Sequence, residues 1–247
     1  MSKVYLVTGA GSEIGLTLLY SLLEAGGKII ACDRLENREK MNKYFSAIKD
    51  SLIKTYFIDL NNDNEVNTFW NEIEEKGIKI YSLINIAGIN ILTDFFSWER
   101  NELNKVFELN FTSTVLFTKR AAQHMILNSI KGNIIFISSQ NGNVVSKYRV
   151  PYCTSKAMLI QMTKALALEL SDFNIRVNCL SPTYVLTKDN EKLLNNPYFI
   201  TNELSKIPVG RYAIPEDIVK SILFLTSSDS EMINGHNLII DGGWTLP

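Results

Sequence analysis

Tyr152 and Lys156 are a pair whose residue types and spacing could move a proton. They stand four positions apart in a stretch with a helical pattern, so both side chains would project from one helix face. A free tyrosine has a pKa of ~10, which is too high for an efficient base near neutral pH. A nearby lysine ammonium favours the phenolate and lowers that pKa. An isolated pair at this spacing is usually a surface contact, so its chemistry depends on the residues around it.

A glycine-rich turn near the N-terminus could hold a pyrophosphate. Gly9, Gly11 and Gly15 follow a short apolar run, Val4–Thr8, and lead into a helical pattern from about Ile14 to Ala25. Backbone N–H groups at such a strand-to-helix turn can approach the phosphates of a dinucleotide. A tight turn without a ligand is the alternative.

Acidic residues at the ends of the next two apolar runs could select the dinucleotide. Asp33 comes 18 residues after Gly15, close to the spacing at which a carboxylate accepts hydrogen bonds from an adenosine ribose. Its charge would repel a 2′-phosphate, which favours NAD over NADP, although Arg34 could pair with that phosphate. Asp33 could also be only a turn residue. Asp59 could hold an adenine amino group or cap a turn.

Short apolar runs alternate with longer amphipathic stretches along the chain. The runs predict strands at Val4–Thr8, Lys28–Asp33, Leu52–Ile58, Tyr81–Asn85, Asn133–Ser138, Ile175–Leu180 and Asn237–Ile240. The intervening helices include one long helix at about Trp98–Leu127 and another at Tyr152–Leu170. Apolar strands alternating with helices indicate a parallel sheet covered on both faces. We therefore expect one domain over residues 1–247, a doubly wound, Rossmann-like α/β fold of about seven strands with its sites at the carboxyl ends of the strands.

Composition excludes several functional classes. The formal net charge is −1, so nucleic acid is not expected as a partner, because phosphate binding needs a concentrated basic surface. No apolar run reaches the ~20 residues of a membrane span, and no signal-peptide pattern opens the chain. Three scattered cysteines predict reduced thiols and a cytoplasmic protein. The two histidines are too few and too distant for a His-based metal site, and no metal is expected.

The motifs occur in the order, and at the strand ends, that are typical of one enzyme family. The chain resembles the short-chain dehydrogenase/reductase family over essentially all 247 residues. The resemblance rests on three motifs in order: Ser138-Ser139, then Tyr152-Cys153-Thr154-Ser155-Lys156, then Ser181-Pro182. The resemblance implies an oxidoreductase that interconverts a secondary alcohol and a ketone with a nicotinamide cofactor. It implies a catalytic tetrad of Asn110, Ser139, Tyr152 and Lys156.

Each member of this tetrad has an expected role. Tyr152 is the acid/base, and Lys156 lowers its pKa and hydrogen-bonds the nicotinamide ribose. Ser139 holds the substrate oxygen; it is chosen over Ser138 because it lies 13 residues before Tyr152. Asn110 positions water for a proton relay behind Lys156.

The resemblance also implies the cofactor contacts, with some departures from the family pattern. They are Gly9, Gly11, Ser12, Glu13, Ile14, Gly15, Asp33, Arg34, Asp59, Leu60, Asn85, Ala87, Gly88, Tyr152, Lys156, Pro182, Val185 and Thr187. Glu13 stands where the family has a glycine, and a carboxylate beside a pyrophosphate is unfavourable unless it points to solvent. Ile86 replaces the second asparagine of the NNAG motif, and Thr183 replaces the glycine of Pro-Gly.

Three segments, 89–96, 140–150 and 184–206, are expected to determine the substrate, the last of them as a lid. Predicted substrate contacts are Ser139, Gln140, Asn141 and Tyr184. The amides and charges of these segments favour a sugar, polyol or cyclitol over a steroid. A 3-oxoacyl-(carrier protein) reductase is the alternative, with Lys147 and Arg149 available to the carrier; it would usually prefer NADPH and carry a basic residue where Ser12 stands.

A non-catalytic dinucleotide-binding regulatory protein is a second alternative, supported only by Glu13. The family implies a homo-oligomer, a tetramer or a dimer, built on the two long predicted helices and the C-terminal helix and strand. A small-molecule substrate is the other expected partner, with no membrane.

Overall fold

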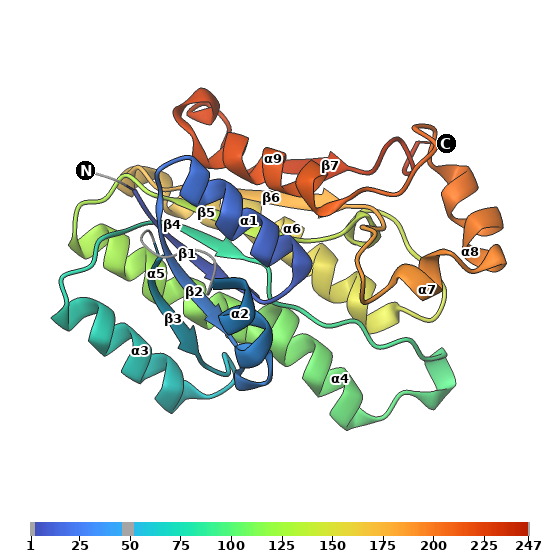
Figure 1. Cartoon of the computed structure of the whole chain (residues 1–247), viewed down its shortest axis with the longest axis horizontal. Coiled ribbons are helices and arrows are strands. Elements are labelled where there is room, and N and C mark those ends of the chain that lie inside the picture. The colour runs from blue at the N-terminus through green and yellow to red at the C-terminus, as the bar shows by residue number, and fades with distance from the viewer. Residues whose placement is uncertain (1–2, 46–51, 247) are drawn as a thin grey trace.

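The computed structural model describes residues 3–45 and 52–246. Within these residues seven strands form one parallel sheet, in the order β3-β2-β1-β4-β5-β6-β7 (Figure 1). The strands are β1 (Val4–Thr8), β2 (Lys28–Asp33), β3 (Leu52–Phe57), β4 (Ile80–Asn85), β5 (Asn133–Ile137), β6 (Arg176–Pro182) and β7 (Asn237–Ile240). The predicted Rossmann-like α/β fold of about seven strands is confirmed.

Helices cover both faces of the sheet because successive strand side chains point to opposite faces. Leu6 enters a core closed by α3 (Asp63–Glu75), α5 (Thr114–Leu127) and α6 (Val150–Glu169). Its neighbour Val7 enters a second core, closed by α1 (Glu13–Glu24), α2 (Arg38–Phe45) and α9 (Pro215–Thr226). Figure 1 shows α1 and α9 on one side of the sheet and α3 and α5 on the other.

The single long helix predicted at about 98–127 is wrong. The segment contains α4 (Arg100–Phe107), a π-helical turn (Glu108–Ser113) and then α5. The side chain of Asn110 is hydrogen-bonded to the backbone of Ile89, in the loop after β4. A π turn of this kind accommodates one extra residue and is common at functional sites. Apolar periodicity does not reveal it, because the hydrogen bonds lead to a distant segment.

The carboxyl ends of the central strands lie side by side. Thr8 at the end of β1 is level with Cys32 of β2 on one side and with Asn85 of β4 on the other. The strand order reverses between β1 and β4, because the chain continues from β1 to β2 and β3 on one side and to β4 on the other. This reversal leaves a crevice where ligands bind in open parallel sheets. The residues that follow β1, β2, β4, β5 and β6 therefore share one edge.

The segment from Tyr184 to Lys206 folds against that same edge. It contains two short helices, α7 (Glu191–Leu194) and α8 (Pro197–Asn202). Leu194 packs with Ile207 and Tyr212 in a small apolar cluster apart from the two main cores. Over the residues that the structure describes, no helix has the length and apolar character to cross a membrane.

Candidate functional site

The glycine turn after β1 is built so closely that side chains are excluded from it. Gly9 has a φ of +67°, and a Cβ added there would lie 2.6 Å from the backbone nitrogen of Ala87. A Cβ on Gly15 would lie 2.5 Å from the carbonyl oxygen of Gly9. Ser12 caps α1, because its hydroxyl accepts a hydrogen bond from the Gly15 N–H at 3.1 Å. The start of α1 is thereby held against β1 and the loop after β4.

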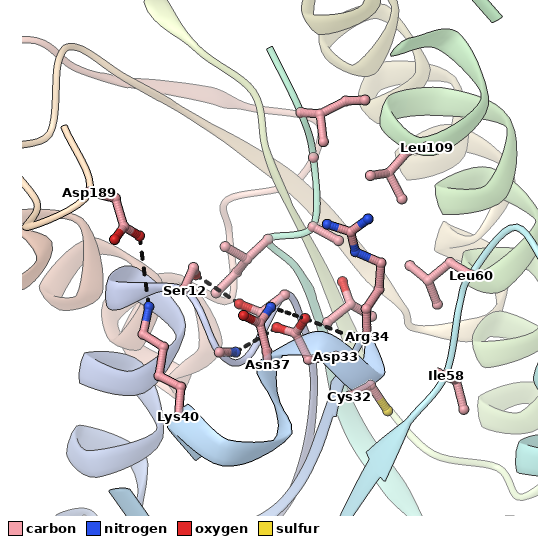
Figure 2. Close-up of a pocket in the computed structure, with 17 residues that line it drawn as sticks. Ser12, Cys32, Asp33, Arg34, Asn37, Lys40, Ile58, Leu60, Leu109 and Asp189 are labelled. Carbon is pink, nitrogen blue, oxygen red and sulfur yellow. Dashed lines mark hydrogen bonds and ion pairs between the residues drawn. The ribbon is translucent and has the colours of Figure 1, made fainter. Parts of the chain in front are cut away.

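Asp33 lies at the centre of a cleft of about 220 Å³ beside this turn (Figure 2). Its carboxylate accepts hydrogen bonds from the Gly11 N–H at 2.6 Å and from the Asn37 side-chain amide at 2.7 Å. Arg34 turns to form an ion pair with the exposed Glu36. The charge presented at the end of β2 is therefore a buried carboxylate, which repels a further phosphate.

Most of the predicted cofactor residues that follow β1, β2, β3 and β4 line this cleft. They are Gly9, Gly11, Ser12, Asp33, Arg34, Leu60, Ala87 and Gly88. Other lining residues were not predicted as cofactor contacts, among them Thr8, Asn37, Lys40, Ile58, Leu109 and Asp189. Asn37 could have been predicted, since it lies four residues after Asp33. Leu109 and Asp189 come from distant segments, so no local pattern indicates them.

Six predicted cofactor contacts are not among the residues that line the clefts: Glu13, Gly15, Asp59, Asn85, Lys156 and Pro182. Asp59 accepts a hydrogen bond from the Asn61 N–H at 2.9 Å, which is the turn-capping alternative. The amide nitrogen of Asn85 donates to Thr118 at 3.1 Å, within the core. Pro182 ends β6, and it is the next residue, Thr183, that lines a cleft.

Glu13 points to the segment at 184–206. Its carboxylate accepts a hydrogen bond from the Lys188 N–H at 2.7 Å. Nearby, Lys40 lies 3.8 Å from Asp189, and Figure 2 shows this ion pair bordering the cleft. Glu13 is not among the residues that line the cleft, so its carboxylate is directed away from the place expected for a pyrophosphate.

A second cleft, of about 230 Å³, contains the predicted proton-transfer residues. Ser139 follows β5 and Tyr152 lies in the first turns of α6; both line this cleft. Gln140, Asn141, Tyr184, Val185 and Thr187 line it too, as does Ile14. Arg149, Thr183 and Asn190 complete the lining without having been predicted as contacts.

Ser138 and Ser139 have different roles in the structure. The Ser138 hydroxyl is buried and donates to the carbonyl oxygen of Lys156 at 2.8 Å. The Ser139 hydroxyl accepts from the Asn141 N–H at 3.1 Å and faces the cleft. The position of the Ser139 hydroxyl at the cleft agrees with the prediction that Ser139, and not Ser138, holds the substrate oxygen.

Lys156 is buried close to Tyr152, beneath this cleft. The Lys156 ammonium lies 5.7 Å from the centre of the Tyr152 ring and donates to the carbonyl oxygen of Ile137 at 2.8 Å. Burial lowers the pKa of Lys156 to about 8. Burial raises the pKa of Tyr152, whereas a hydrogen bond with Ser139 and the positive charge of Arg149 act to lower it.

Asn110 lies behind this pair, in the π-helical turn. Its side chain donates to the Ile89 carbonyl at 2.8 Å and to the Ser155 hydroxyl at 3.1 Å, and it accepts from the Ile89 N–H at 2.7 Å. A Cβ on Gly88 would lie 3.2 Å from the Asn110 amide oxygen and 3.3 Å from the Lys156 ammonium. Gly88 therefore lets both polar groups approach one backbone position.

Several buried polar atoms along this edge lack a hydrogen-bond partner within the described residues. They are Thr8 Oγ1, Asn85 Oδ1, Gln140 Oε1 and Thr183 Oγ1. Buried polar groups are normally paired, so this edge fits a polar ligand. The described residues contain no group of three or more metal-ligating acidic, cysteine or histidine side chains.

Comparison with known proteins gives consistent matches over nearly the whole chain. A family described as enoyl-(acyl carrier protein) reductase matches residues 9–245. The NAD-dependent glycerol dehydrogenase of Listeria innocua is 32% identical over 245 residues, covering 99% of this chain and 94% of the relative. The L-xylulose reductase of Caenorhabditis elegans is 31% identical over 248 residues, covering 98% and 96%.

Solved structures agree with these relatives. A 4-hydroxyisoleucine dehydrogenase complexed with NADH superposes with a TM-score of 0.93 at 30% identity, covering 100% of both chains. A neighbour with NADP bound has a TM-score of 0.90 at 28% identity, covering 99% of both chains.

Proposed function

The chain is an oxidoreductase that belongs to the short-chain dehydrogenase/reductase family, and on that premise we propose that it uses NAD(H) to interconvert a secondary alcohol and a ketone on a polar, hydroxylated substrate. One observation carries the proposal: Tyr152 and Ser139 line one cleft at the same sheet edge as the Asp33 cleft, and the buried Lys156 ammonium lies 5.7 Å from the centre of the Tyr152 ring. The bound nicotinamide supplies the hydride acceptor or donor.

The residues of this chain would then divide the remaining work. Ser139 holds the substrate oxygen, and the Tyr152 phenolate accepts the hydroxyl proton as the hydride leaves the carbinol carbon. In the reverse direction the Tyr152 phenol donates that proton to the carbonyl oxygen. Lys156 favours the phenolate through its charge. Asn110 holds the loop after β4 beside Lys156 and provides polar groups for proton exchange with water.

NAD is proposed over NADP because of Asp33. The buried carboxylate is hydrogen-bonded to the glycine turn, while Arg34 is engaged by Glu36. A ribose with free hydroxyls can donate to the carboxylate, whereas a 2′-phosphate would bring a second negative charge beside it. The named relatives support both the nicotinamide chemistry and a polar substrate, since they include a dehydrogenase of glycerol and a reductase of xylulose.

The test is turnover with NAD and, separately, NADP against sugars, polyols, cyclitols and 3-hydroxyacyl thioesters, followed by reduced-cofactor absorbance. We expect turnover of a polar alcohol with NAD. Turnover of thioesters alone, with NADP, would instead assign a 3-oxoacyl-(carrier protein) reductase.

Tyr152→Phe tests the acid/base within the same assay. Losing a positioned proton-transfer group should lower kcat/KM by ~10²–10⁴-fold, with cofactor affinity retained. Tyr20→Phe, on the exposed side of α1, is the matched control. If Tyr152→Phe kept full activity, the acid/base would be another residue. Cofactor binding with no turnover of any alcohol or thioester would favour a regulatory protein.

A further inference from the structure

Arg149 joins two clefts on the substrate side of the molecule. It lines the cleft that contains Ser139 and Tyr152, and also an outer cleft of about 790 Å³, and Tyr184 lines both of them too. Its guanidinium lies over the ring of Tyr184, 5.6 Å from the ring centre. A cation over an aromatic face is oriented without losing its hydrogen-bond donors. Arg149 is therefore directed at the space where a substrate extends away from the reacting carbon.

The Arg149 guanidinium has no acidic partner among the described residues. None of the ion pairs that the structure shows includes it. A half-buried arginine usually has a carboxylate, a phosphate or a carbonyl oxygen against its planar set of donors. Its positive charge is felt at the reacting centre, since it acts to lower the pKa of Tyr152.

The charged residues of the outer cleft, Arg149 included, carry an excess of one positive charge. The cations that line it are Lys147, Arg149 and Lys206, and the acids are Asp94 and Glu203. Asp94 is engaged by its own loop, and Glu203 is paired with a cation of the same cleft, with its second carboxylate oxygen buried and without a hydrogen-bond partner among the described residues. Asp94 accepts from the Phe96 N–H and the Ser97 hydroxyl, and Glu203 lies 3.7 Å from Lys206. An excess of one charge suits a monoanion better than a dianionic phosphate.

Backbone geometry next to Arg149 indicates a constrained position. Tyr148 has a φ of +64°, in the left-handed region that a bulky residue rarely adopts. The strained turn is held by the Tyr148 carbonyl, which accepts from the Thr93 N–H at 3.1 Å. Such outliers persist where the surrounding structure enforces them, often at ligand sites. Here the turn places Arg149 directly before the first residue of α6.

We propose that Arg149 binds a carboxylate of the substrate, so that the protein acts on a hydroxy acid or oxo acid, such as a sugar acid, in preference to a neutral polyol. The inference rests on the proposed alcohol–ketone chemistry and names the substrate class of that site. The two planar N–H groups of the guanidinium match the two oxygens of a carboxylate, and the outer cleft has room for a hydroxylated chain.

The test compares pairs of substrates that differ only in the acid group: gluconate with sorbitol, and 3-hydroxybutyrate with 1,3-butanediol. A charge-assisted hydrogen bond should give the acid a kcat/KM about 10- to 100-fold above that of its neutral partner. Arg149→Gln should abolish this preference, mainly through KM. Arg149→Lys keeps the charge without the planar donors, and should restore part of it. Phosphorylated hydroxy compounds form a third arm, in which preference for the phosphate would overturn the carboxylate assignment.

Arg38→Gln is the matched control, because Arg38 also lies over an aromatic ring, that of Phe57, outside the clefts. The preference should survive in it. Better turnover of the neutral partners by the wild type would overturn the inference, as would an Arg149→Gln variant with unchanged preference.

A binding measurement separates this inference from the proposed reaction. Calorimetry with 3-hydroxybutyrate and gluconate, on the NAD-loaded protein, needs no turnover. If no alcohol is oxidised, the proposed reaction fails, and the inference is still judged by this titration. Carboxylate binding that is lost in Arg149→Gln supports it, and binding that is absent or equal in both proteins overturns it.

Discussion

Lys156 shows how function and stability conflict at a single residue. Its side chain is buried, and within the described residues it is in no ion pair. Desolvation of a charge is costly, which is why the pKa of Lys156 falls from 10.5 to about 8. At neutral pH the folded protein still holds the charged form, and in the proposed mechanism this charge favours the Tyr152 phenolate.

Lys156→Met should therefore stabilise the fold while removing activity. A pKa lowered from 10.5 to about 8 corresponds to a penalty of up to ~3 kcal/mol at pH 7. The unfolded chain binds more protons than the folded one between these pKa values, so wild-type stability rises with pH across that window. Urea unfolding at pH 7 and pH 10 should show a gain for the variant at pH 7 that shrinks at pH 10.

The hydrogen bond from Lys156 to Ile137 opposes this gain, because the variant leaves a buried carbonyl unpaired. Lys164→Met, on an exposed position of α6, is the control and should show no such pH dependence. The stability of Lys156→Met relative to wild type is expected to be higher at pH 7 than at pH 10. The opposite order would contradict a lowered Lys156 pKa in the folded protein.

At the scale of elements, the start of α1 is linked to the segment at 184–206. Glu13 accepts the Lys188 N–H, and Lys40 on α2 lies near Asp189. A backbone N–H bonded to a carboxylate is a charge-assisted hydrogen bond, stronger than one between neutral groups. The glutamate at a position that is glycine in the family therefore has a structural use here, in holding a proposed lid.

Glu13→Gly and Glu13→Gln should show whether the hydrogen bond to Lys188 holds the segment at 184–206. The glycine variant loses the acceptor for Lys188, so we expect faster proteolysis within residues 184–206 and a substrate KM raised by about 3- to 10-fold. The glutamine variant keeps an oxygen acceptor and should remain near wild type. Limited proteolysis and steady-state kinetics check both. Equal protection in all three proteins would show that this contact does not hold the segment.

At the scale of the whole molecule, α5 and α6 lie on the same side of the sheet and expose apolar side chains. Leu116 and Leu127 of α5 and Leu168 of α6 are exposed, the last at 78%. A contiguous exposed apolar patch is typical of a surface that another subunit covers. Family membership supports the expectation of a homo-oligomer, which remains a prediction.

Leu168→Asp should shift the molecule towards a smaller species if α6 contributes to that contact. A charge in the centre of an apolar interface is left desolvated and unpaired, so association should weaken at least tenfold, or about 1.4 kcal/mol. Size-exclusion chromatography with light scattering gives the mass of each protein. Val209→Asp, at an exposed apolar position away from both helices, is the control. An unchanged oligomer in Leu168→Asp would place the interface elsewhere.

The sequence by itself determined the order of elements and most of the residues at the site. Apolar runs between turn residues predict β1, β2 and β7 with the bounds that the structure has. This works because strand pattern and turn chemistry are local properties of the chain. The site residues could be located for a related reason: in a parallel sheet, whatever follows a strand arrives at one common edge.

Only the tertiary structure decided how the side chains at that edge are used. Glu13 and Lys188 are 175 residues apart, and nothing near Glu13 in the chain shows that its carboxylate turns to the segment at 184–206. The π-helical turn at Asn110 depends in the same way on the Ile89 backbone. Arg149 lines two clefts because a strained turn and the ring of Tyr184 place it there. Such contacts depend on packing between distant segments, which local sequence patterns do not encode.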